Sequence, residues 1–184
     1  MDYFTSDLHF FHDKEFIYKP RGFNSEEEMR YAYLAEIKNT VKENDNLHIV
    51  GDVCLGQDLD KIKEVLSSLP GKIHIYIGNH DTQSKIDLYK SLPNVVEVVY
   101  ANEIKHGKRT YYVSHYRTDV SCLECSPKTS KINIHGHIHT KQIHYEDIPY
   151  FINVSVDAQN GKLVTFDDIE KMFNEQVKKC IDNL

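Results

Sequence analysis

Residues that can bind metal ions recur in short clusters along the chain, which contains 11 histidines. The clusters are Asp7-Leu8-His9, Gly51-Asp52, Gly78-Asn79-His80-Asp81, Ser114-His115 and His135-Gly136-His137-Ile138-His139. Their His, Asp and Asn side chains offer nitrogen and oxygen ligands, which suit manganese, iron, zinc or cobalt better than a structural zinc site. Asp-x-His is common in turns and Gly-Asp is common after strands, whereas Gly-Asn-His-Asp is more telling and His-x-His is a frequent feature of metal sites. Because an unsatisfied buried polar group costs about 1–3 kcal/mol, their recurrence in this order favours one shared site.

The first clusters follow segments that we expect to be β-strands. Met1 to Ser6 is partly β-prone, Leu47 to Val50 is apolar, and isoleucines alternate with polar residues from Ile73 to Ile77. Side chains two residues apart point the same way in an extended chain, so Asp7 and His9 can reach one ion. Ligands at the carboxyl ends of strands in one α/β sheet converge on a common crevice.

Two amphipathic helices separate these three strands. Ser25 and Glu28 match a capping box ahead of a helix that runs to about Lys42, and a second helix covers Leu59 to Leu69. The first half therefore predicts a β-α-β-α-β arrangement, with crossovers long enough for parallel strands. The segment from Asp7 to Pro20 is typical of a functional loop.

The second half of the chain is richer in strands. The expected strands are Val95 to Tyr100, Thr110 to Val113, Ile132 to Ile134 and Phe151 to Val156, with a hairpin turn at His106-Gly107-Lys108 and a last helix from Asp168 to Ile181. Helices early in the chain and strands late in it predict an α/β sandwich of two central sheets covered by helices.

Composition limits the classes of partner. The net charge of -6 argues against long nucleic acid, because non-specific affinity for it comes from Lys and Arg. No targeting segment or membrane-spanning apolar stretch is visible, so we expect a cytoplasmic protein without a membrane partner. Cys122 and Cys125 form a lone C-x-x-C pair, which we interpret as ordinary reduced thiols.

The order of the clusters resembles the signature of the calcineurin-like metallophosphoesterases. The resemblance covers Asp7 to His139 directly and extends to Asn153-Val154-Ser155-Val156-Asp157. Ser6-Asp7-Leu8-His9-Phe10-x-His12 and Arg21-x-Phe23 are similar to small single-domain bacterial and phage members. The implied fold is a four-layer α-β-β-α sandwich, formed by a single domain over residues 1–184.

The resemblance also implies two divalent metal ions, drawn from Mn, Fe, Zn or Co with Mn favoured. The implied ligands are Asp7, His9 and His139 for one metal, Asn79, His115 and His137 for the other, and Asp52 as the bridge. His80 would lie outside the metal shell as the catalytic acid, and Asp81 would serve catalysis by orienting the site.

Three further residues are expected to contact substrate. His12 lies beside the ligands in sequence, and Arg21 and Arg117 could clamp phosphate oxygens through their planar guanidinium groups. For Arg117, a solvated surface position is an equal alternative.

The expected function is hydrolysis of a phosphomonoester or phosphodiester by a hydroxide that bridges the two metals. The chain is too short to add a cap domain over the site, so we expect an open cleft that favours small soluble diesters. Two alternatives stay open: a nuclease-type phosphodiesterase acting on nucleic acid, and a non-catalytic interaction protein on the same fold.

Overall fold

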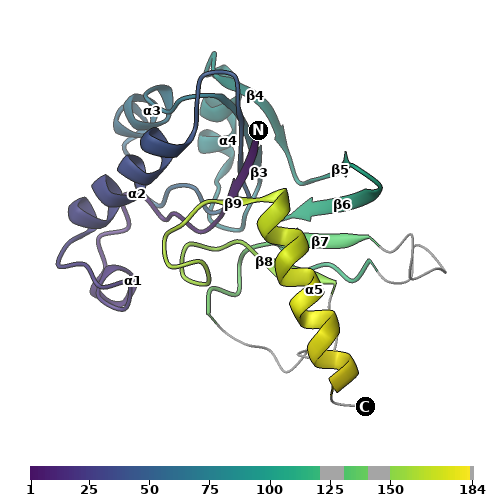
Figure 1. Cartoon of the computed structure of the whole chain (residues 1–184). Helices are drawn as coiled ribbons and strands as arrows, with labels where there is room; N and C mark the ends of the chain where they lie inside the picture. Colours follow the sequence, from purple (N-terminus) through teal and green to yellow (C-terminus); the bar gives the residue numbers. More distant parts are fainter. Residues whose placement is uncertain (121–130, 141–149, 183–184) are drawn as a thin grey trace.

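Two β-sheets lie at the centre of the molecule, and helices flank them (Figure 1). The computed structural model describes residues 1–120, 131–140 and 150–182, so the Cys122 and Cys125 pair lies outside the described residues. The two-sheet α/β architecture expected from the sequence is confirmed.

The first sheet has the strand order β4-β3-β2-β1-β9. Its strands are β1 (Asp2–Thr5), β2 (Asn46–Ile49), β3 (Lys72–Tyr76), β4 (Val95–Val99) and β9 (Val164–Thr165). Strands β1 to β4 pair in parallel, and β9 pairs antiparallel with β1. The parallel β1-β2-β3 core with its helical crossovers was expected from the sequence and is confirmed.

Four helices connect the strands of this sheet: α1 (Glu15–Tyr18), α2 (Glu26–Thr40), α3 (Leu59–Ser67) and α4 (Gln83–Ser91). The backbone N–H of Glu28 donates to Ser25 Oγ at 3.1 Å, which caps α2 as expected. Helix α1 lies inside the segment expected to be a loop, and α4 was not predicted. Within the described ranges, no helix combines the length and the apolar character needed to cross a bilayer.

The second sheet has the strand order β5-β6-β7-β8. Its strands are β5 (Ala101–His106), β6 (Arg109–Ser114), β7 (Ile132–His135) and β8 (Phe151–Asn153). β5 and β6 form an antiparallel hairpin, whereas β6, β7 and β8 are parallel. Helix α5 (Phe166–Asp182) runs across this sheet and contacts β8 (Figure 1).

Two buried apolar clusters account for the packing of these layers. In the first cluster, α2 and α3 pack on one face of the first sheet, to which Leu47 and Ile49 point. The second cluster joins residues of both sheets and α5, including Phe4 and Phe166. Because side chains alternate along a strand, each strand of the first sheet can supply both clusters.

The two sheets meet just beyond their strand ends. Ser6, which follows β1, forms an isolated parallel bridge with Ser155, and the Val156 N–H donates to the Ser6 carbonyl at 3.0 Å. This junction replaces the end of the strand expected up to Val156. The loops that follow the strands of both sheets are thereby brought to one place.

Phe4 tests the packing between the layers. Its ring is fully buried, stacks on His48 at 4.6 Å and meets Phe166 at 4.9 Å between ring centroids. We expect Phe4→Ala to lower the free energy of unfolding by about 3–5 kcal/mol, because it leaves a cavity. Urea denaturation measures this loss. The control Tyr100→Ala, at a side chain that is 71% exposed, should stay within about 0.5 kcal/mol of wild type.

Candidate metal centre

The expected ligands all follow strands at the junction of the two sheets. Those after β1, β2 and β3 come from the first sheet, and those after β6 and β7 come from the second. Two groups form, each with ligand atoms within 4.8 Å of one another: Asp7, His9 and His139 in the first group, and Asp52, His115 and His137 in the second.

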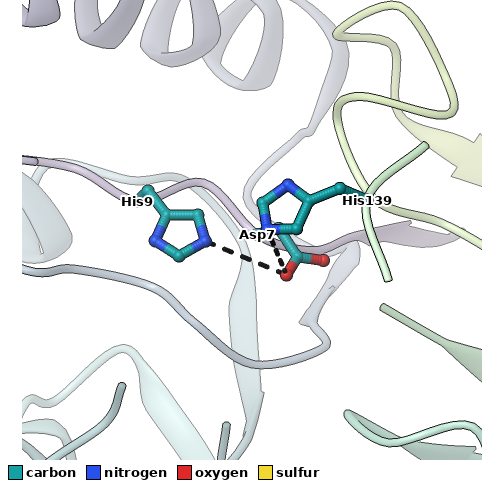
Figure 2. Close-up of side chains that lie close together, drawn as sticks. All are labelled: Asp7, His9 and His139. Carbon is teal, nitrogen blue, oxygen red and sulfur yellow. Dashed lines mark ion pairs between the residues drawn. The ribbon is translucent and has the colours of Figure 1, made fainter. Parts of the chain in front are cut away.

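In the first group, the two imidazoles face one carboxylate oxygen (Figure 2). Asp7 Oδ1 lies 4.0 Å from His9 Nε2 and 3.7 Å from His139 Nε2. Ligand atoms bound at about 2.0–2.2 Å to one cation are separated from each other by roughly 3–4 Å, so this spacing fits a metal ion.

His9 gives a separate reason to place a cation here. The residue is 2% exposed, and neither of its ring nitrogens has a hydrogen-bond partner in the described structure. Buried polar atoms without partners are rare, and coordination to a metal would satisfy one of these nitrogens. Burial lowers the pKa of His9 to about 3, so its imidazole is neutral at pH 7, as a metal ligand must be.

Asn79 joins the second group through His115. The Asn79 side-chain oxygen lies 3.1 Å from His115 Nε2. The other ring nitrogen, Nδ1, donates to the carbonyl of Val50 at 2.9 Å. That bond fixes the orientation of the ring and points Nε2 toward Asn79 and Asp52, where a metal could bind.

Asp52 lies between the two groups. Its Oδ2 atom is 3.7 Å from His9 Nε2 and 3.4 Å from His115 Nε2. Burial opposes ionisation of Asp52, but the hydrogen bond and charge of His115 lower its pKa to about 2. Asp52 therefore faces a histidine nitrogen of each group.

Left-handed backbone conformations determine the directions in which the ligand side chains point. Positive φ angles occur at Asp7, His9, Asp52, His137 and His139. The convergence of Asp7 and His9 therefore arises from turns after β1, and not from the extended chain expected from their spacing. Such conformations cost about 1–3 kcal/mol each and concentrate at functional sites.

Two glycines allow the ligand loops to approach closely. A Cβ atom at Gly78 would lie 2.3 Å from Asp52 Oδ1, and one at Gly136 would lie 2.5 Å from Asp7 Oδ2. Any larger residue would push a carboxylate out of place. The glycines in these two clusters thus create room for the carboxylates.

The expected phosphate clamp Arg21 is buried and faces inward, which does not match that role. Its side chain is 3% exposed and forms a two-pronged ion pair with Asp157, at 2.8 and 2.7 Å. It also donates to the carbonyl of Asp7 at 2.9 Å. Arg21 therefore supports the ligand loop after β1.

Asp157 orients His139. The Asp157 carboxylate accepts a 2.6 Å hydrogen bond from His139 Nδ1, which leaves Nε2 to face Asp7. Burial opposes ionisation of Asp157, but the bonds to His139 and Arg21 lower its pKa to about 2. The Asp157 bond raises the pKa of His139.

Asp81, which was expected to orient the site, is a buried residue that holds backbone groups of two loops. It is 6% exposed, and its carboxylate accepts backbone N–H bonds from Asp52 at 3.0 Å and Gly78 at 2.9 Å. Burial raises the pKa of Asp81. Asp81 thus links the loops after β2 and β3.

The other expected residues lie as follows. His12 is near the first group, with its ring centroid 5.7 Å from that of His9. His80 is exposed, with its ring centroid 5.4 Å from that of His9. The Arg117 guanidinium lies 3.8 Å from the centre of the Phe151 ring at the start of β8, a cation–π contact.

Three buried residues that hold the loops are absent from the expected site: Glu26, Lys85 and Tyr89. Glu26 accepts the Phe11 N–H at 2.7 Å, but in sequence it is indistinguishable from any acidic residue in a first helical turn. Lys85 and Tyr89 follow Asp81 at intervals of four residues. The four-residue spacing indicates a shared face only if α4 is recognised as a helix.

Comparisons with known proteins extend over nearly the whole chain. A family model described as calcineurin-like phosphoesterase matches residues 3–180. The uncharacterized protein MJ1445 of Methanocaldococcus jannaschii is 29% identical over 196 residues, covering 99% of this chain and 97% of that protein. The crystal structure of AQ665, a protein of unknown function from Aquifex aeolicus, aligns with a TM-score of 0.72 at 23% identity, over 94% of this chain and 98% of that one. This last likeness shows a shared fold.

Asp157→Asn tests the support of His139. We expect the affinity for Mn²⁺ to fall about 10–100-fold, because the imidazole loses the carboxylate that orients it. Isothermal titration calorimetry measures the affinity. The control Asp87→Asn, on the exposed side of α4, should bind as wild type does. Unchanged affinity in a folded Asp157→Asn variant would contradict the role assigned to Asp157.

Proposed function

Because the chain belongs to the calcineurin-like phosphoesterases, it is a metal-dependent phosphoesterase, and we propose that it hydrolyses small soluble phosphodiesters. We further propose that it holds two divalent cations, with manganese favoured. The proposed ligands are Asp7, His9 and His139 for one cation, Asn79, His115 and His137 for the other, and Asp52 shared between them. When bound, the cations supply positive charge for the phosphate oxygens and activate the attacking water.

The position of Asp52 is the observation that carries the two-cation proposal. One of its oxygens is within 3.7 Å of a histidine nitrogen from each group. A single-cation site would need only one of the groups and would leave the other set of histidines without a role. Both groups instead share this ionised carboxylate.

His80 is the residue that we propose to protonate the leaving oxygen. It lies outside both ligand groups found among the described residues, and its side chain is exposed. Its backbone N–H donates to Asp52 Oδ1 at 2.9 Å, which anchors the residue beside the site. Imidazole is the side-chain group most often used as a general acid.

The arginines favour a diester over a monoester. Arg21 is paired with Asp157 inside the protein, and Arg117 packs on Phe151. A monoester dianion gains most from extra guanidinium groups at the phosphate, whereas a diester carries one negative charge. His12, close to His9, is the remaining candidate for contacting the substrate.

The charge of the chain supports a small substrate. A net charge of -6 works against binding a long polyanion, since such binding depends on Lys and Arg neutralising phosphates. The chain contains all the proposed metal ligands and also His80. This complete set supports a catalytic role over a purely binding role.

His80→Ala tests proton donation. General acid catalysis contributes about 10²–10⁴-fold, so we expect a kcat loss of that order for a diester that releases an alkoxide. The loss should be much smaller for bis-p-nitrophenyl phosphate, because p-nitrophenolate leaves without a proton. Steady-state kinetics on both substrates, with metal content measured in parallel, separates the two roles. Equal losses on both substrates would argue against the acid.

The substrate class is tested by comparing kcat/KM for bis-p-nitrophenyl phosphate and p-nitrophenyl phosphate in Mn²⁺ at neutral pH. We expect the diester to be preferred, because Arg21 is paired with Asp157 and Arg117 packs on Phe151. A clear preference for the monoester would contradict this proposal and indicate a phosphomonoesterase.

A further inference from the structure

Lys85 is a buried lysine that connects two of the ligand loops. Lys85, on α4, is 2% exposed, and its ammonium donates to the carbonyls of Cys54 at 2.7 Å and His80 at 3.1 Å. Removing an ammonium from water is costly, so a buried one requires hydrogen bonds that compensate for the lost hydration. An apolar side chain of similar length could fill this space without that cost.

The two carbonyls belong to different loops of the site. Cys54 lies two residues after Asp52 in the loop that follows β2, and His80 lies in the loop that follows β3. Lys85 therefore bridges the loop that carries Asp52 and the loop that carries the proposed acid.

The peptide groups of His80 are held on both sides. Its N–H donates to Asp52 Oδ1 at 2.9 Å, and its carbonyl accepts from Lys85. With both backbone groups fixed, the imidazole can move only by rotation about its side-chain bonds. Loss of the Lys85 bond would leave the His80 carbonyl without this side-chain donor.

Neighbouring residues reinforce this connection. Tyr89, one helical turn beyond Lys85, donates to Asp81 Oδ1 at 3.0 Å, and Asp81 accepts N–H bonds from both loops. Residues four apart lie on one face of a helix, so α4 presents Lys85 and Tyr89 to the same place. The Asp81 carboxylate accepts hydrogen bonds from backbone N–H groups of the loops, and the Lys85 ammonium donates to backbone carbonyls. Together the two side chains satisfy both donors and acceptors of the loop backbone.

We propose that Lys85 is a positioning residue for catalysis, which fixes the His80 imidazole relative to Asp52. This proposal rests on the proposed role of His80. It differs from a purely structural role because its effect should depend on whether the leaving group needs a proton.

Lys85→Met keeps a flexible side chain of similar length and removes both hydrogen bonds. Small misplacements of a reacting group can cost up to about 10²-fold, so we expect kcat to fall at least about 10-fold for a diester that releases an alkoxide. For bis-p-nitrophenyl phosphate we expect kcat to stay within about 3-fold of wild type, because no proton transfer is needed. KM should change little for either substrate. The control Lys90→Met, at an exposed lysine in the last turn of α4, should match wild type.

A double variant sharpens the test. Once His80 is removed, Lys85→Met should cause little further loss, because residues that act through one another are not additive. Losses that multiply in the double variant, or equal losses on both ester types, would overturn the proposal.

Hydrogen exchange of the metal-free protein provides a readout that needs no turnover. In Lys85→Met we expect the His80 amide to exchange faster than in wild type, while amides in β2 and β3 keep their protection. Uniformly faster exchange would mean that Lys85 only supports the fold, and unchanged exchange at His80 would also refute the proposal. If the wild-type protein fails to hydrolyse diesters, the proposed function fails, but this exchange experiment still decides whether Lys85 restrains the His80 backbone.

Discussion

The position of the Asp52 carboxylate is the constraint on which the site depends. One oxygen faces His9 and His115, and the other accepts the backbone N–H of His80. These neighbours come from three different loops, so moving the carboxylate would disturb both ligand groups and the proposed acid together. The absence of a side chain at Gly78 gives the carboxylate its room, since a Cβ there would overlap it.

The ligand loops adopt backbone conformations that they would not adopt alone. Several ligands have positive φ angles, and hydrogen bonds from neighbouring side chains stabilise these conformations. Arg21 donates to the carbonyls of Asp7 and Leu8, and Glu26 accepts the N–H of Phe11. Strained conformations persist when their surroundings determine them in several ways at once. The buried ion pairs and helix faces around the site perform this function, which explains why so many charged groups lie inside the protein.

The features that could be predicted from the sequence are those that depend on residues close together in the chain. The ligand clusters and the strands before them could be read because residue types and alternation are visible in a short window. The role of Arg21 could not, because burial and a partner far along the chain, Asp157, decide whether this charged side chain faces substrate or backbone. Helix α4 was missed because Ile86 and Tyr89 are its only buried apolar residues. Strand β5 has no buried residue to give it a pattern.

The ligand groups also join distant parts of the chain. The first group combines Asp7, near the N-terminus, with His139, and the second combines Asp52 with His137. During synthesis neither group is complete until the β7 loop has left the ribosome. The loops after β1 and β2 supply two residues of the first group and one of the second, so neither group can be completed without residues from the second sheet. A metal ion bound by either group would therefore link the two sheets.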